Sequence, residues 1–242
     1  MQTIRIFQDS SEAGRLRLNS KAMGPAGRLK ASVIDISPSF APQRGRVETF
    51  IRQIYEKSYG ADIDVLYPTL MSVRTSAGEI LAGIGFRYAS EEPLFLERYT
   101  KAPIEETLSV LYNKDICRSQ IVEIGNLASI GKGASIYLFA ALSSYLHARG
   151  IDFATVTGTD FLQKRFHRLG LQPQRVCSAD PELLTEEERR RWGSYYDTKP
   201  GVLTGSVGNG VHHLKKALGV VYEEQPGISL FSRLHFKKSF SS

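Results

Sequence analysis

A single carboxylate, Glu123, lies within the largely apolar run of residues 121–128. Such a run predicts a buried strand. A carboxylate on a buried strand is costly unless it is paired or takes part in chemistry. We interpret Glu123 as a general base or an amine anchor. A structural ion pair with Arg87 explains it equally well, and the residues alone leave both interpretations open.

A glycine-rich turn follows this strand. Gly131 and Gly133 flank Lys132, and Ala134 leads into an apolar stretch that predicts a helix over residues 135–149. Glycines let the backbone approach a ligand closely, and the beginning of a helix presents free N–H groups that suit a phosphate. Gly-x-Gly is a weak signal on its own, however, and an ordinary strand-to-helix turn needs the same glycines.

Further polar and aromatic residues are candidates for a site. Glu97 and Arg98 stand together, either as functional groups or as a solvated local salt bridge. Trp192, Tyr195 and Tyr196 form an aromatic patch that lines a pocket or packs in a core. The sequence has no Gly-x-Ser-x-Gly elbow of a serine hydrolase and no histidines or cysteines at metal spacing, so we assign no metal.

Composition limits the class of protein. The chain has 242 residues, of which 42 % are hydrophobic, and this is enough for one large domain with a packed core. Its two cysteines are too few for a disulfide scaffold, and no apolar window is long enough for a membrane span. We therefore expect a cytoplasmic protein. A net charge of +6 favours anionic partners, but no lysine-rich arm suggests nucleic acid.

The order of the expected elements indicates an α/β fold. Helices are expected at residues 46–59, 103–112, 135–149, 161–169 and 185–191, and strands at 3–7, 31–36, 67–75, 80–88, 121–128, 153–157 and 175–178. Two glycines in the strand 80–88 suggest a bulge or a close approach of another chain segment. The later alternation of strand and helix predicts a mixed sheet, flanked by helices, that contains a parallel pair.

This order resembles the GNAT superfamily of acyltransferases, in which a Gln/Arg-x-x-Gly-x-Gly/Ala loop holds the pyrophosphate of coenzyme A. Gly131 and Gly133 fit this loop, whereas Ala128 stands where glutamine or arginine is expected. The resemblance implies that Leu127, Ser129, Gly131, Lys132, Gly133 and Ala134 bind the acyl donor. Phe166 stands where that superfamily often has a tyrosine that serves as general acid.

Two stretches resemble the acyl-homoserine-lactone synthase branch of that superfamily. Residues 59–64 and 85–87 supply Asp62, Asp64 and Arg87, and residues 122–128 match a motif in which Glu123 is retained and Asn126 replaces an arginine. The resemblance implies that Glu123 is catalytic. From the residues themselves we add Glu97 as a second catalytic candidate and Asn126, which could orient a substrate amide or cap the glycine turn. The resemblance also implies substrate binding by Asp62, Asp64 and Arg87, and the aromatic patch of Trp192, Tyr195 and Tyr196 is added to these.

Four motifs in order, at residues 93–99, 122–128, 166–171 and 192–196, are similar to the thermostable hemolysin family of bacteria. We expect residues 1–45 to be an N-terminal extension, 46–210 a GNAT-like domain and 211–242 a basic tail. The expected function is transfer of a fatty or medium-chain acyl group from acyl-CoA or acyl carrier protein to an amine such as an amino acid, with no permanently bound cofactor. A membrane-acting cytolysin, with peripheral membrane contact, and a non-catalytic acyl-binding domain remain the alternatives.

Overall fold

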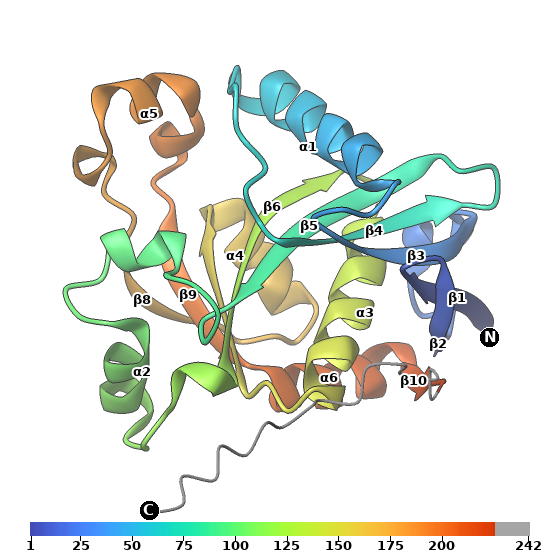
Figure 1. The fold of residues 1–242 in the computed structure, drawn as a ribbon. Coiled ribbons are helices and arrows are strands. Elements are labelled where there is room, and N and C mark those ends of the chain that lie inside the picture. Colours follow the sequence, from blue (N-terminus) through green and yellow to red (C-terminus); the bar gives the residue numbers. More distant parts are fainter. Residues whose placement is uncertain (226–242) are drawn as a thin grey trace, which may run out of the picture.

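The computed structural model describes residues 1–225 and shows an α/β fold built on one mixed sheet (Figure 1). Its strands are β1 Gln2–Gln8, β2 Ser11–Leu18, β3 Ala31–Pro38, β4 Thr69–Thr75, β5 Ile80–Tyr88, β6 Ile121–Ser129, β7 Phe153–Gly158, β8 Gln174–Ser178, β9 Gly201–Ser206 and β10 Val221–Glu224. Its helices are α1 Arg44–Tyr59, α2 Ile104–Tyr112, α3 Ser135–Ala148, α4 Asp160–Arg168, α5 Glu186–Arg191 and α6 Val207–Leu218. The strand order is β10-β2-β1-β3-β4-β5-β6-β7-β9-β8. The predicted mixed sheet flanked by helices is confirmed.

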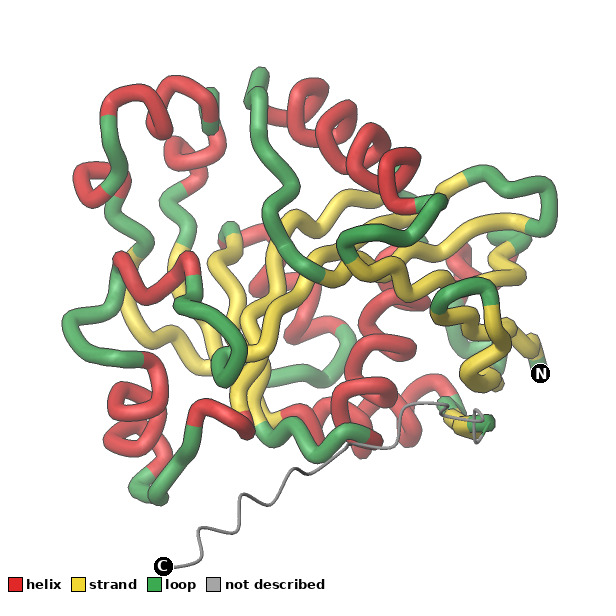
Figure 2. The backbone as a smooth tube through the Cα atoms, viewed as in Figure 1, coloured by secondary structure: helices red, strands yellow, loops and turns green. Residues whose placement is uncertain are grey.

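Helices cover both faces of this sheet (Figures 1 and 2). Helix α1 buries Val47, Ile51 and Tyr55 against one face and ends at Gly60, whose φ of 62° is the left-handed conformation that glycine adopts readily. Helix α3 packs on the other face, beside α6. It is apolar on nearly every side, because the sheet and α6 leave little of it in contact with water.

The centre of the sheet contains both antiparallel and parallel strand pairs. Strands β4 and β5 form the expected antiparallel hairpin, and β5 continues antiparallel to β6. Strand β6 then pairs parallel to β7, from Ile121 opposite Phe153 to Ile124 opposite Val156. The predicted parallel pair is therefore present, and its registered pairing stops halfway along β6.

The sequence did not predict β2, β9, α6 or β10. Strand β9 contains two glycines and lies between β7 and β8, where it pairs antiparallel to both. The segment 1–45, expected as an extension, contributes β1, β2 and β3 to the same sheet. Of the expected basic tail, residues 211–218 belong to α6, and residues 226–242 lie outside the described part of the chain.

Candidate functional site

Strand β6 carries a bulge immediately after Glu123. Gly125 pairs with Gly85 of β5, whereas Ala128 pairs with Gly83, so β6 has one residue more than β5 across this stretch. Asn126 takes up the extra residue with a φ of 50°. This irregularity begins where the registered pairing with β7 stops. Backbone groups at a bulge are partly released from the sheet ladder and are available to a ligand.

The bulge corrects one expectation about β6. Simple alternation would place Leu127 on the same face as Glu123 and Gly125. Instead, Leu127 packs with Val122 and Ile124 on the face covered by α3. The extra residue at Asn126 shifts the alternation by one, so every side chain after it points to the opposite face.

Glu123 is almost fully buried, with 1 % of its surface exposed, on the α1 face of the sheet. Its two carboxylate oxygens accept hydrogen bonds from the backbone N–H groups of Phe95 and Leu96, both at 2.9 Å. Arg87 lies directly opposite on β5, and its Nε is 3.3 Å from the carboxylate. Burial raises the pKa of Glu123 above its ordinary value, against the lowering effect of these donors. The ion pair with Arg87 is therefore present, and it does not exclude a role in catalysis.

The ring of Tyr67 connects Glu123 to a cavity. A Cβ at Gly85 would lie 2.7 Å from the Tyr67 side chain, and one at Gly125 would lie 2.1 Å from its hydroxyl oxygen. Only glycine fits at this cross-strand pair, which makes a groove for the ring. The Tyr67 side chain also lies close enough to Glu123 for the two groups to influence each other, and burial, followed by the charge of Glu123, raises the pKa of the phenol well above its ordinary value. The tyrosine therefore stays protonated at neutral pH.

The aromatic cavity, of about 400 Å³, opens on this face of the sheet. It is lined by eight of the residues singled out in the sequence, namely Asp62, Asp64, Arg87, Arg98, Asn126, Trp192, Tyr195 and Tyr196. The segment 61–67 brings in both aspartates because its residues alternate between buried and exposed positions, with 62, 64 and 66 exposed. The fold thus gathers groups that lie up to 134 positions apart in the sequence into one site.

The sequence did not predict Tyr67, which lines this cavity, or Arg44, which holds the segment that carries Tyr67. Tyr67 follows the alternation of residues 61–67, a period of two that could have revealed an extended segment facing the core. Arg44 is 8 % exposed and donates hydrogen bonds to the carbonyls of Tyr67 at 2.7 Å and Pro68 at 3.1 Å. It fixes the end of this segment to helix α1. No local pattern in the sequence marks an arginine for that task.

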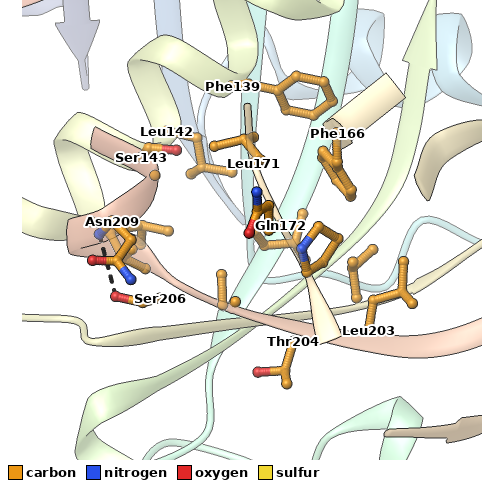
Figure 3. A pocket seen from close by; sticks show the side chains of 18 of the residues that line it. Phe139, Leu142, Ser143, Phe166, Leu171, Gln172, Leu203, Thr204, Ser206 and Asn209 are labelled. Carbon is orange, nitrogen blue, oxygen red and sulfur yellow. Dashed lines mark hydrogen bonds between the residues drawn. The ribbon is translucent and has the colours of Figure 1, made fainter. Parts of the chain in front are cut away.

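A second cavity, of about 300 Å³, lies on the opposite face of the sheet among β6, β7, β9, α3, α4 and α6. We call it the apolar cavity because its walls are mainly aliphatic and aromatic. Figure 3 shows Phe139 of α3 and Phe166 of α4 on one side of it and Ser206 and Asn209 on another. The two phenyl rings are 5.1 Å apart. Phe166 is thus part of an apolar wall, and Leu127 also lines this cavity.

Ile124 is the residue that lines both cavities. It stands at the last registered position of the parallel pair, opposite Val156. One cavity lies on the α3 face and the other on the α1 face. The place where β6 and β7 lose their pairing is therefore the place where the two cavities come nearest to each other.

The glycine turn has the backbone that the sequence suggested. Gly131 and Gly133 both have a φ of 85°, and Lys132 between them has a φ of 51°. A Cβ at Gly133 would also lie 2.6 Å from the Cβ of Ala26. The N–H of Gly131 donates to the Ser129 hydroxyl at 3.2 Å, which leaves Ser129 as a brace within the turn. Helix α3 begins at Ser135, and its N-cap residue Ala134 provides no side-chain cap. The N–H groups of Ile136 and Tyr137 donate to the carbonyls of Gly133 and Ala134.

Glu97 lies outside the aromatic cavity. Its carboxylate accepts hydrogen bonds from the N–H groups of Leu94 at 2.8 Å and Ile104 at 3.0 Å, and Arg118 pairs with it at 2.6 Å. These contacts hold the short helical turn Phe95–Arg98. The structure therefore does not bring Glu97 together with the other predicted catalytic residues. The contacts of Glu97 are those of a structural residue.

Two kinds of feature do not occur in residues 1–225. No helix there is both long and apolar enough to cross a membrane. That part of the chain also contains no group of three or more histidine, cysteine or acidic side chains placed to hold a metal ion.

Comparison with solved structures finds the same fold in synthases. The AHL synthase LasI is 14 % identical, with 72 % of this chain and 89 % of that chain covered and a TM-score of 0.50. FeeM, an N-acyl amino acid synthase from uncultured soil microbes, is 14 % identical, with 75 % and 99 % covered and a TM-score of 0.50. TofI in an apo form is 13 % identical, with 75 % and 95 % covered and a TM-score of 0.51. At these identities the likeness shows the fold alone.

No curated protein matches the sequence. A family description does match, and it covers residues 38–211 with the description "Thermostable hemolysin". These residues are more than half of the chain. They include β6 and β7, which contribute residues to both cavities, and the glycine turn. The chain, with its GNAT-like α/β fold, therefore belongs to the thermostable hemolysin family.

Proposed function

We propose that this protein is an N-acyltransferase. It moves a fatty or medium-chain acyl group from acyl-CoA or acyl carrier protein to a small amine, a class that includes the amino acids. The observation that carries the proposal is the pair of cavities on opposite faces of the sheet, which meet at Ile124. The apolar cavity suits an acyl chain, and the charged and aromatic cavity suits a polar acceptor.

Charge on the α3 face supports an anionic donor. Helix α4 carries Lys164, Arg165 and Arg168, and α6 carries Lys215 and Lys216. None of these five side chains forms a salt bridge within residues 1–225. Coenzyme A and the prosthetic group of a carrier protein both present phosphate, and unpaired cations around the cavity attract it. The glycine turn is the proposed phosphate site, with Leu127, Ser129, Gly131, Lys132, Gly133 and Ala134 around it.

In the proposed reaction the amine nitrogen attacks the thioester carbonyl where β6 and β7 part. A C–N bond forms, the C–S bond breaks, and the amine loses a proton while the thiolate leaves with the electron pair. Released N–H groups of the bulge, next to Asn126, stabilise the oxyanion as it develops. Glu123 receives the proton through the Tyr67 hydroxyl, which lies between the carboxylate and the aromatic cavity.

Thiol release tests the proposal. Purified protein is incubated with acyl-CoA or acyl carrier protein donors of several chain lengths and a pool of amines, and free thiol is followed over time. Acylated amine that appears in step with thiol supports the enzyme. Vesicle leakage caused by donor-free protein, with no thiol release, would support a membrane lysin instead. Donor binding without turnover would support a non-catalytic acyl-binding domain.

Two substitutions separate a catalytic Glu123 from a structural one. Tyr67→Phe keeps the ring in its glycine groove and removes only the hydroxyl, and we expect kcat to fall by about 10²-fold or more because the proton path is cut. Glu123→Gln is expected to lose at least as much. If Tyr67→Phe retains full kcat while Glu123→Gln unfolds early in a thermal scan, Glu123 is a structural residue.

A further inference from the structure

The aromatic cavity has little capacity to receive a carboxylate. Its arginines already face acidic groups of the protein. Arg191 pairs with Asp64 at 2.7 Å, Arg98 with Glu188 at 2.8 Å, and Arg87 lies between Glu123 at 3.3 Å and Glu92 at 3.6 Å. Each arginine charge is thus already opposed by a carboxylate of the protein, although Arg87 Nε has no hydrogen-bond partner within residues 1–225. A ligand carboxylate gains less from such an opposed cation than from a free one.

Asp62 adds a carboxylate without a partner to this cavity. It lines the cavity, is exposed, and forms no salt bridge within residues 1–225. The cavity wall itself holds three carboxylates, those of Asp62, Asp64 and Glu188, and three arginines, while Glu92 and Glu123 lie against Arg87 outside the wall. The exposed carboxylate of Asp62 is therefore accessible to a ligand.

Aromatic rings add to this preference for a cation. Trp192 lies 5.0 Å from Tyr195 and 5.9 Å from Tyr196, measured between ring centroids, and all three line the cavity. Two further rings of the wall already receive cations, since Arg87 lies 4.5 Å from the ring centre of Tyr67 and Arg98 lies 4.0 Å from that of Phe95. The faces of such rings attract ammonium groups.

Two uncharged polar groups line the cavity where β6 and β7 part. The hydroxyl of Thr157, on β7 beside the point where the strands part, is buried and has no hydrogen-bond partner in residues 1–225. Asn126 lines the same cavity, and its side chain makes no hydrogen bond to that part of the protein. These groups can accept or donate to a neutral amine near the reaction centre.

We propose that the acceptor is an alkyl diamine without a carboxylate. This assignment rests on the proposed acyl transfer. An attacking amine must be neutral, so a site that attracts cations is best used to hold a second ammonium group. Asp62 and the rings of Trp192, Tyr195 and Tyr196 hold that ammonium at the wide part of the cavity. The other amine reaches Thr157 and Asn126, where it is neutral and faces the thioester.

Matched acceptors test this assignment directly. Cadaverine and lysine differ by one carboxylate, as do tyramine and tyrosine, and each is supplied to the full-length protein with one fixed acyl-CoA. We expect kcat/KM for cadaverine to exceed that for lysine, and also that for tyramine, by at least about tenfold. A kcat/KM for lysine or tyrosine equal to that for cadaverine would overturn the assignment. A kcat/KM for tyramine as high as that for cadaverine would also overturn the assignment, because tyramine has no second ammonium group.

A single substitution checks the proposed ammonium site. Asp62→Asn is expected to raise the KM for cadaverine by about tenfold and to leave the KM for the acyl donor unchanged, since only the acceptor contacts Asp62. Asp115→Asn, which removes an exposed carboxylate outside the cavity, is the control and should change neither. An unchanged KM for cadaverine in Asp62→Asn would refute the site. Absence of thiol release with every acceptor would instead count against acyl transfer itself.

Discussion

Replacing Gly125 with alanine tests the contact on which the aromatic cavity depends. Gly125 does not have a positive φ, so the backbone itself accepts alanine. The new Cβ would lie 2.1 Å from the hydroxyl oxygen of Tyr67 and 2.4 Å from Cζ, and the ring cannot retreat because Gly85 and Arg87 lie against it. Overpacking of this kind costs about 1–3 kcal/mol. In a chain of this size, that lowers Tm by about 2–12 °C.

Thermal unfolding followed by circular dichroism measures this effect. Gly45→Ala in α1, where a Cβ would meet nothing within 4 Å, is the matched control and should keep or slightly raise Tm. In a Tyr67→Ala background the same Gly125→Ala change should cost almost nothing, since the clash is gone. A Tm shift below about 1 °C for Gly125→Ala, or an equal shift in both backgrounds, would refute the proposed contact.

Three other changes have defined outcomes. Burial alone raises the pKa of Glu97, but hydrogen bonds from Arg118 and two backbone N–H groups outweigh it and hold the pKa below 4.5. Its ionised form therefore stabilises the fold at neutral pH, and this stability is lost as the pH falls through the lowered pKa. Glu97→Gln should lower the urea-unfolding free energy at pH 7, with a deficit that shrinks in acid; a deficit that grows in acid would contradict this. Arg44→Met leaves two buried carbonyls without their donor and should cost about 1–3 kcal/mol in the same assay, whereas a cost below about 0.5 kcal/mol would show that the arginine is dispensable. Leu171→Trp narrows the apolar cavity, so kcat/KM should fall for long-chain acyl-CoA and persist for acetyl-CoA, and an equal fall for both would place the acyl chain elsewhere.

Much of the central sheet was predictable because its strands have strong local patterns. The apolar run at 121–128 and the hairpin at 67–88 fall within two residues of the observed β4, β5 and β6. The glycines of β5 were expected to mark a bulge or a close approach, and both occur there. Strand β9 has no such pattern, since two of its six residues are glycine, and it is held by pairing with β7 and β8. Tertiary pairing of this kind is not encoded in a short window of sequence.

The site was predictable residue by residue but not as an arrangement. Asp62, Arg87, Asn126 and Trp192 were all selected, and the fold places them around one cavity. Their mutual positions depend on the strand register and on where the segment before β4 packs against the sheet, and neither follows from a local pattern. Leu127 shows the limit most clearly, because one extra residue at the bulge reverses its face. A bulge leaves the composition of a strand unchanged while it redirects every later side chain.

Glu123 affects the site in either of its possible roles. Its carboxylate and that of Glu97 together accept the N–H groups of residues 94, 95 and 96, so two glutamates hold the turn that carries Phe95 and Arg98 into the cavity wall. Loss of activity on replacing Glu123 is therefore expected whether Glu123 acts as a general base or as a structural residue. Tyr67 separates the two roles, because its hydroxyl reaches Glu123 from the cavity while its ring is held independently by Gly85. Removing that hydroxyl leaves both backbone hydrogen bonds to Glu123 in place, so a fall in kcat from this change alone assigns the carboxylate to the proton path.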